Sequence, residues 1–435
     1  MRIGYPYRFK LMKSVRDVDR ALRQVVRSAS ANIPVYGDLL KTANVSVDRF
    51  RGLTDLPRLP VVQRELLMLD TPLARRITRR VAPARLVSTS TSGSDGMPVR
   101  VYMSKTEAMF RKLTLIRAWG RVAPLRLPYT VIDVGARSEP KKTLDLSWHG
   151  AIRLIRLPLS DLAKIKPGLL RRYRPAVLGG YPSSLMLLAE RLGQVSACPP
   201  FPSLQLVASR GEILHEEERE ILMRVFRCQV ADFYNCEEIG NIAWQCPADP
   251  TRLHINLDTC VVEVVDESHA PVPAGADGKI LVTSLYNYTM PLIRYDLQDR
   301  GHILPPSEEP CSCGSVFASM GLVQGREDDI LMLSDGTRAS PRWLATLLDE
   351  SAARIRENDI ENSPFRQYEI VQDAPGHITI RIVPTLPEDS RLAHIILSAF
   401  QRLDPGMKYS VELVSELPPP PSGKRRKVRR TTLSP

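Results

Sequence analysis

Three short apolar runs decide the fold class of this chain: TVIDV at residues 130–134, AVLGG at 176–180 and LQLVA at 204–208. The second run is followed by a helical pattern that reaches residue 192, and the third by a charged helical pattern over 216–226. An alternation of short strands with helices is typical of a parallel sheet covered by helices. The sequence therefore predicts an α/β fold with mainly parallel strands between about residues 129 and 300.

The segments on either side of this region complete the expected architecture. Apolar residues recur at helical spacing over residues 14–43, which predicts an amphipathic helix. Strands at 253–265 and 279–285 suggest a small antiparallel or barrel-like element. After about residue 326 the expected order is a helix, a two-stranded hairpin, a second helix and a strand at 409–414, which is a compact α+β unit. We expect a large N-terminal α/β domain, residues 1–325, and a small α+β C-terminal domain, residues 326–435, joined by a hinge.

The composition is that of an ordinary globular protein. The 435 residues are 43% hydrophobic and 25% charged, which excludes wholesale disorder and a collagen-like or coiled-coil fibre. No window holds the roughly 18 consecutive apolar residues of a membrane span, so none is expected. Seven cysteines spread over a long chain do not form the pattern of a secreted disulfide framework. A cytoplasmic protein is expected.

The basic residues are partly concentrated in the tail. Lys and Arg exceed Asp and Glu by 12, and six basic residues with no acidic one stand in residues 421–435. A short basic terminus can bind polyanions weakly. The chain has no recognised nucleic-acid module and no aromatic residues interleaved with the tail, so nucleic acid is not an expected partner.

Two polar loops could bind a nucleotide and its metal. Residues 90–98 read STSGSDGMP, in which glycines allow a tight turn and the hydroxyls add donors for phosphate oxygens. No Gly-Lys-Ser/Thr follows, so this is not a Walker-type loop. Residues 232–240 read DFYNCEEIG, in which a Tyr can stack on a purine and a carboxylate can hold a divalent ion. Taken singly, each is equally an ordinary surface loop.

Two further segments suit a sugar. Residues 291–299 (PLIRYDLQD) end in Asp299, and residues 325–329 (GREDD) contain Arg326. A carboxylate accepts the hydrogens of two neighbouring hydroxyls, and a guanidinium donates to their oxygens. Alone, neither segment is specific.

In their order, these motifs resemble those of the adenylate-forming superfamily of acyl-CoA synthetases, and within it the phenylacetate–CoA ligase and CapK-like branch. The matching segments are IPVY at 33–36, DLPRLP at 55–60, the phosphate loop at 91–98, the segment from 173 to 183, SRGE at 209–212, the hinge at 325–329 and SGKR at 422–425. The resemblance spans nearly the whole chain. Departures from the family pattern stand at Asp95, Met97 and Asn235, where the family usually has Thr, Lys or a small residue, and Gly.

The resemblance implies a role for each matching residue. The ATP phosphates would be held by Thr91, Ser92, Gly93, Ser94 and Gly96. Adenine would stack on Tyr234 beside Gly211 and Glu212, and the ribose would bind Asp299 and Arg326. Glu238 would hold Mg²⁺ and assist catalysis, Lys424 would be the catalytic lysine, and Asp328 the hinge.

The implied activity is that of a ligase. It would activate a small carboxylic acid, aryl or otherwise hydrophobic, as acyl-AMP with release of pyrophosphate, and would pass the acyl group to CoA. ATP, Mg²⁺ and CoA are the expected cofactors, and the branch suggests a homodimer. Two alternatives stay open. One keeps the adenylation but uses an amine, hydroxyl, polysaccharide or coenzyme acceptor; the other is a degenerate polyanion-binding or scaffold protein.

Four residues suggest a metal site: Cys246, His254, Cys311 and Cys313, in the pattern Cys-x7-His…Cys-x-Cys. Four nitrogen and sulfur ligands suit a tetrahedral structural zinc, and Pro-Cys-Ser-Cys-Gly is a tight turn that exposes both sulfurs. Some relatives in the branch carry a similar set. The alternative is reduced, buried cysteines and a surface histidine.

Overall fold

The computed structural model describes residues 15–67, 72–90, 100–135, 144–147, 151–158, 167–193, 201–306, 309–355, 364–385, 390–418 and 426–431. The chain divides into two compact units, each built from segments that are distant in sequence. Unit 1 comprises Met1–Ala118, Tyr234–Leu297 and His302–Gly321, and unit 2 comprises Trp119–Phe233, Gln298–Gly301 and Leu322–Pro435. The expectation that residues 326–435 behave as a separate domain stays a prediction.

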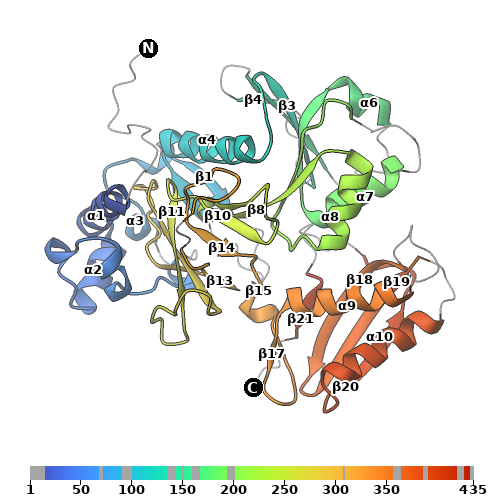
Figure 1. Ribbon diagram of the computed structural model, residues 1–435. Helices are drawn as coiled ribbons and strands as arrows, with labels where there is room; N and C mark the ends of the chain where they lie inside the picture. The colour runs from blue at the N-terminus through green and yellow to red at the C-terminus, as the bar shows by residue number, and fades with distance from the viewer. Residues whose placement is uncertain are drawn as a thin grey trace. The chain divides into compact units, whose positions relative to one another are not determined.

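The predicted parallel strands form the main sheet of unit 2 (Figure 1). They lie in the order β8 (Gln229–Cys236), β7 (Leu206–Arg210), β6 (Pro175–Gly180), β3 (Tyr129–Val134), β5 (Ile152–Leu157) and β4 (Leu144–Ser147). Within this set, neighbouring strands are parallel except β4 with β5. The expected α/β class with a parallel sheet is confirmed.

Helices cover one face of this sheet: α6 (Pro167–Arg172), α7 (Pro182–Gly193) and α8 (Glu216–Phe226). Figure 1 shows α7 and α8 side by side along the strands. Their shared core includes Ile132 and Leu178 from the strands and Leu188 and Leu222 from the helices, all fully or almost fully buried. Because side chains alternate along a strand, the residues next to Ile132 and Leu178 point to the opposite face.

Unit 1 contains the N-terminal helices and antiparallel strands. The helices are α1 (Val15–Asn32), α2 (Pro34–Thr42), α3 (Leu73–Arg76) and α4 (Lys105–Val122), the last of which begins in unit 1. The strands are β1 (Val87–Ser90) with β2 (Arg100–Met103), β9 (Gly240–Gln245) with β10 (Arg252–Ile255) and β14 (Ser319–Gly321), and β11 (Cys260–Val265) with β12 (Gly278–Ser284). Short 3-10 turns span 47–49, 53–58, 64–67 and 83–85.

The single helix expected over residues 14–43 is two helices, and that prediction was wrong. The first ends at Asn32 and the second begins at Pro34. Proline has no N–H group to continue the hydrogen bonding of α1, but it fits the first turn of a new helix, where that donor is not needed.

The C-terminal part of unit 2 has the expected α+β order. Its elements are β15 (Gly325–Arg326), a 3-10 turn (Glu327–Asp329), β16 (Leu331–Met332), β17 (Arg338–Ala339), α9 (Pro341–Ile355), β18 (Phe365–Ala374), β19 (His377–Pro384), α10 (Ser390–Leu403), β20 (Lys408–Leu413) and β21 (Val428–Arg430). Strands β20-β19-β18-β21 form one sheet. Leu348 of α9 and Phe400 of α10 pack with Ile370 and Ile380 of that sheet in a core of its own.

The described part of the basic tail contains the strand β21, and three of its basic side chains are in ion pairs. Val428 of β21 lies opposite Ile370 of β18 in parallel register. Arg426 pairs with Asp329 at 3.4 Å, the Lys427 Nζ lies 2.5 Å from Glu218 Oε1, and Arg429 pairs with Glu369 at 2.9 Å. These basic side chains therefore stabilise the fold of unit 2 rather than forming a patch of unbalanced charge.

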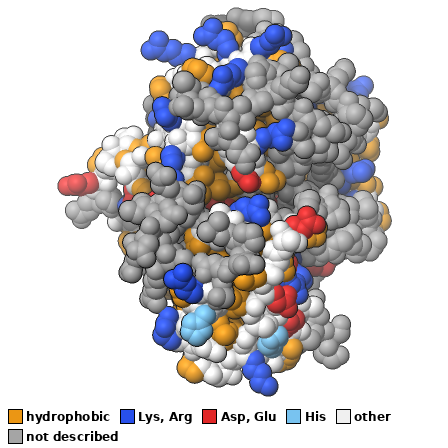
Figure 2. All heavy atoms as spheres, turned by 90° about the vertical axis from the view of Figure 1, so that its right-hand side faces the viewer, with side chains coloured by type: hydrophobic (Ala, Val, Ile, Leu, Met, Phe, Trp, Pro, Cys, Tyr) orange, Lys and Arg blue, Asp and Glu red, His pale blue; other side chains and the backbone are white. Residues whose placement is uncertain are grey.

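On the face drawn in Figure 2, Lys and Arg side chains are spread from top to bottom, with hydrophobic side chains between them. Among the described residues, no helix is both long enough and apolar enough to cross a membrane.

Candidate active site and metal centre

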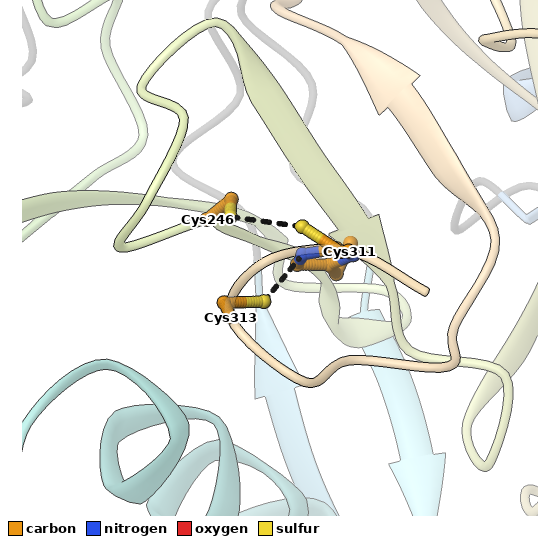
Figure 3. Close-up of side chains that lie close together, drawn as sticks. Cys246, Cys311 and Cys313 are labelled. Carbon is orange, nitrogen blue, oxygen red and sulfur yellow. Dashed lines mark hydrogen bonds between the residues drawn. The ribbon is translucent and has the colours of Figure 1, made fainter. Parts of the chain in front are cut away.

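The predicted metal ligands of unit 1 lie together. Cys246 follows β9, His254 is in β10, and Cys311 and Cys313 stand in the turn before β14. Their ligand atoms all lie within 4.8 Å of one another. The Sγ atoms of Cys246 and Cys311 are 3.5 Å apart, and the Cys313 Sγ is 3.2 Å from His254 Nε2 (Figure 3). In a tetrahedral zinc site, ligand atoms are separated by about 3.5–3.8 Å, so these four residues fit such an ion.

The surroundings of the cluster prepare the histidine for a metal. The Nδ1 atom of His254 is 3.1 Å from Ser319 Oγ, a contact that orients the ring so that Nε2 faces the sulfurs. Burial lowers the pKa of His254, which keeps the imidazole in the neutral form that binds metal ions. Burial also raises the pKa of the Cys246 thiol to about 12, so binding of a metal there must displace a proton.

The two residues expected to bind ribose face each other. Asp299 lies in β13 (Tyr295–Gly301) and is opposite Arg326 of β15 in antiparallel register. Both side chains are half-buried. Gly325, with φ +129°, is required here because an added Cβ would lie 2.6 Å from the ring of Pro341. The expected hinge residue Asp328 is exposed two residues beyond this pair.

The acidic loop after β8 is anchored from three sides. Glu238 is buried, and its Oε1 atom accepts a hydrogen bond of 3.3 Å from the Tyr295 hydroxyl. Its neighbour Glu237 is exposed and accepts hydrogen bonds from the Thr89 hydroxyl, at 2.6 Å, and from Arg111. Glu237 thus ties this loop to the end of β1. No local pattern in the sequence signals this contact, so it was not predicted. Tyr234, the expected adenine partner, is half-buried in β8.

Gly211 and Glu212 support the local fold of unit 2. Gly211 has φ +77°, and an added Cβ would lie 2.7 Å from the Tyr181 ring. Glu212 accepts hydrogen bonds from the backbone N–H of Ser183 at 3.1 Å and from its hydroxyl at 3.0 Å, in the first turn of α7. The phosphate-loop residues Thr91, Ser92, Gly93, Ser94 and Gly96, and the expected catalytic Lys424, lie outside the described residues.

An ion pair in unit 2 was also not predicted. Arg210, the last residue of β7, pairs with Asp133 near the end of β3. The two are 77 residues apart in sequence, so only the strand order brings them together.

Comparison with known proteins gives a consistent set of relatives. No model of a known protein family matches the chain. A phenylacetate-coenzyme A ligase of Thermus thermophilus is 27% identical over 339 residues, which is 76% of this chain and 74% of the relative. Protein CapK of Staphylococcus aureus is 21% identical over 406 residues, 91% of this chain and 84% of CapK.

Among solved structures, a 2-hydroxyisobutyryl-CoA ligase in its postadenylation state, in complex with R3-HIB-AMP, has a TM-score of 0.75. It is 18% identical and covers 96% of this chain and 90% of its own. At that identity the likeness establishes the fold alone.

Proposed function

Since this chain is a relative of the phenylacetate–CoA ligases and CapK within the adenylate-forming superfamily, we propose that it is an ATP-dependent acid–CoA ligase that works through acyl-AMP. The observation that carries the proposal is the sequence match to phenylacetate-coenzyme A ligase over three quarters of both chains. The acid is a small carboxylic acid, and CoA accepts the acyl group.

The described residues support parts of this chemistry. Asp299 and Arg326, opposite each other on adjacent strands, offer acceptor and donor groups for the two ribose hydroxyls. The buried Glu238, oriented by Tyr295, is a carboxylate suited to hold Mg²⁺, which would neutralise phosphate charge when bound. Attack of a carboxylate on the α-phosphate brings two anions together, so a positioned cation such as Lys424 lowers the barrier.

We also propose that residues 326–435 rotate about Asp328 between adenylation and thioester formation. Support comes from the separate core of this segment and from the exposure of Asp328. Rotation would break two contacts with the region around α8: the Lys427–Glu218 ion pair and the 3.2 Å contact between the Tyr368 hydroxyl and His215 Nε2. Asp328→Pro, which restricts φ, should slow thioester formation more than pyrophosphate release.

The test of the activity is pyrophosphate release from a library of carboxylic acids, with and without CoA. We expect release that requires an acid, together with an acyl-CoA product. Lys424→Ala should lower the rate about 100- to 1,000-fold, because a preorganised charge is lost. Lys408→Ala, which removes an exposed lysine at the start of β20, is the matched control and should retain activity.

Two outcomes contradict the proposal. Release that occurs without any acyl-CoA product would favour a different acceptor, an amine or hydroxyl, which the match to CapK over 91% of this chain makes the second candidate. No release from any acid would favour the scaffold interpretation.

We further propose that Cys246, His254, Cys311 and Cys313 bind a structural zinc ion. The four residues would fill all four tetrahedral positions, since their ligand atoms lie within 4.8 Å of one another. The ion would pin the loop after β9 to the turn before β14 and take no part in the reaction.

A further inference from the structure

Two charged side chains, Asp133 and Arg210, lie at the carboxyl ends of parallel strands in unit 2. We place them on the sheet face away from α7 and α8. Asp133 of β3, Gly179 of β6 and Ala208 of β7 are aligned in register. Their neighbours in the chain, Ile132, Leu178 and Val207, point into the helix-covered core. In open α/β sheets, ligands bind beyond the carboxyl ends of the strands.

An ion pair crosses the middle strand at this edge. The guanidinium of Arg210, two residues beyond Ala208 on β7, reaches over β6 to the Asp133 carboxylate. It passes Gly179 so closely that an added Cβ there would lie 3.1 Å from Arg210 Nη1. The two side chains are 30% and 20% exposed, so the pair is partly desolvated but accessible.

The edge that carries this pair is rigidly built. Gly135 after β3 and Gly211 after β7 have φ values of +84° and +77°. The side chains of the turn after β6 fill the space that these glycines leave: an added Cβ would lie 2.6 Å from Ser184 Oγ at Gly135 and 2.7 Å from the Tyr181 ring at Gly211. Groups held on packed strand ends of this kind keep the fixed geometry that recognition requires.

We propose that Asp133 and Arg210 determine acid specificity, selecting a carboxylic acid whose acyl group carries a hydroxyl. This inference rests on the proposed ligase function. The charges of the pair cancel, so a neutral group that both donates and accepts suits it best. A hydroxyl donates to the Asp133 carboxylate and accepts from an Arg210 N–H. An unsubstituted phenyl or alkyl group would displace water from the pair without replacing its hydrogen bonds.

A second carboxylate is the competing substituent. Arg156 of β5 is in register with Asp133 on the neighbouring strand, and its side chain is exposed. It adds positive charge near the pair. We favour the hydroxyl because the Arg156 side chain is exposed, where salt and water screen its charge, whereas the Asp133–Arg210 pair is partly desolvated and its two charges are opposite.

The experiment compares matched acids by kcat/KM for pyrophosphate release. Each series contains the unsubstituted aryl or alkyl acid, the acid with one added hydroxyl, and the acid with a second carboxylate. We expect the hydroxylated member to be preferred by about 10- to 100-fold, less than the roughly 10,000-fold that fully buried sites reach, because both side chains are partly exposed.

The variants then test the two residues. The double variant Asp133→Ala/Arg210→Ala removes both charges together, and the preference should fall below about 3-fold, chiefly through KM. Asp133→Leu/Arg210→Met keeps most of the side-chain volume and removes both the acceptor and the N–H donors, so it should show the same loss and covers the case in which the alanine double variant does not fold. Arg172→Ala, at an exposed arginine of α6, is the matched control and should keep the preference.

The outcomes separate this inference from the proposed function. No pyrophosphate release from any acid would remove the ligase function, and the inference with it. Two other outcomes would overturn the inference and leave the ligase function intact. One is pyrophosphate release with a preference for the unsubstituted or dicarboxylic acid. The other is a preference for the hydroxylated acid that survives in both variants.

Discussion

The cysteine–histidine cluster of unit 1 and the Asp133–Arg210 pair of unit 2 are both small groups of polar side chains on or beside strands. They differ in how far their polar atoms are enclosed by the protein. In the cluster, four soft ligands converge within 4.8 Å, and Cys246 and His254 are buried. In the pair, the oppositely charged side chains of Asp133 and Arg210 are in contact across Gly179 and stay partly exposed. A closed set of four ligands fixes the chain around one ion, whereas an accessible pair can still exchange water for a ligand group. The first is therefore suited to stability and the second to recognition.

The largest expected effect tests the stabilising role of the cluster. Cys313→Ser should abolish the binding of one zinc per chain and lower the free energy of unfolding by more than about 4 kcal/mol, because loss of a structural metal belongs to the most destabilising changes. Metal content measured by elemental analysis and unfolding measured in urea check both parts.

The control for this test is another cysteine of similar burial. Cys228→Ser alters a half-buried thiol beside the core of unit 2 and should retain zinc. A wild-type protein without bound metal, or equal zinc loss in both variants, would contradict the assignment.

A smaller effect is expected at the carboxyl ends of β6 and β7. There, substitution of Gly211 should change the stability of the fold, and substitution of Gly179 should change the acid preference. Gly211→Ala places a Cβ 2.7 Å from the Tyr181 ring at a backbone φ of +77°, so it should lower the free energy of unfolding by about 1–3 kcal/mol. In Gly179→Ala, the one tight contact of the added Cβ would be with the flexible end of Arg210, at 3.1 Å, while Asp133 Oδ1 and the Ala208 carbonyl oxygen lie at 3.6 Å and 3.9 Å. It should leave unfolding within about 0.5 kcal/mol of wild type and change the acid preference instead. Urea unfolding and the matched-acid assay measure the two effects, and equal destabilisation by both substitutions would argue against the distinction.

The difference between the two regions also explains what the sequence could predict. The cysteine–histidine cluster could be expected because Cys-x-Cys in a tight turn is a local signal, and the structure brings His254 and Cys246 to it. The strands β3 and β6 were found because TVIDV and AVLGG are short, mainly apolar runs that alternate with helical patterns. The third run was expected at 204–208, but the strand spans Leu206–Arg210, because Ser209 and Arg210 resemble a loop.

The residues that were missed depend on contacts between distant segments. Arg210 meets Asp133 only because β6 lies between their strands and has a glycine at the crossing point. Hydrophobic periodicity predicts strands but not their order, so it cannot pair residues that are 77 positions apart. In the same way, β21 was hidden because Val428 is flanked by basic residues. Its place beside β18 becomes clear only from the parallel backbone pairing of the two strands and the Arg429–Glu369 ion pair.

The smallest expected effect concerns a second buried histidine, His215, which can be compared with His254, the proposed metal ligand. His215 lies between Gly211 and α8, and its Nε2 atom is 3.2 Å from the Tyr368 hydroxyl. Burial, followed by the positive charges of Lys427 and Arg342, lowers its pKa well below the usual value. The folded protein therefore keeps His215 neutral, whereas the unfolded chain binds a proton near pH 6.5.

The sign of the effect follows from this difference. Below about pH 6.5 the unfolded state binds a proton that the folded state does not, so the free energy of unfolding falls as the pH decreases, by up to about 1.4 kcal/mol per pH unit. The nearby Asp232 acts in the opposite direction, because burial raises its pKa to about 6 and the folded state gains a proton there first. His215→Gln removes only the first contribution, so its stability between pH 6.5 and 5 should fall less steeply than that of wild type, while Asp232→Asn should fall more steeply. Urea unfolding at several pH values measures these slopes. Parallel curves for wild type and His215→Gln would show that His215 has the same pKa in the folded and unfolded states, and would contradict the lowered pKa expected from its burial.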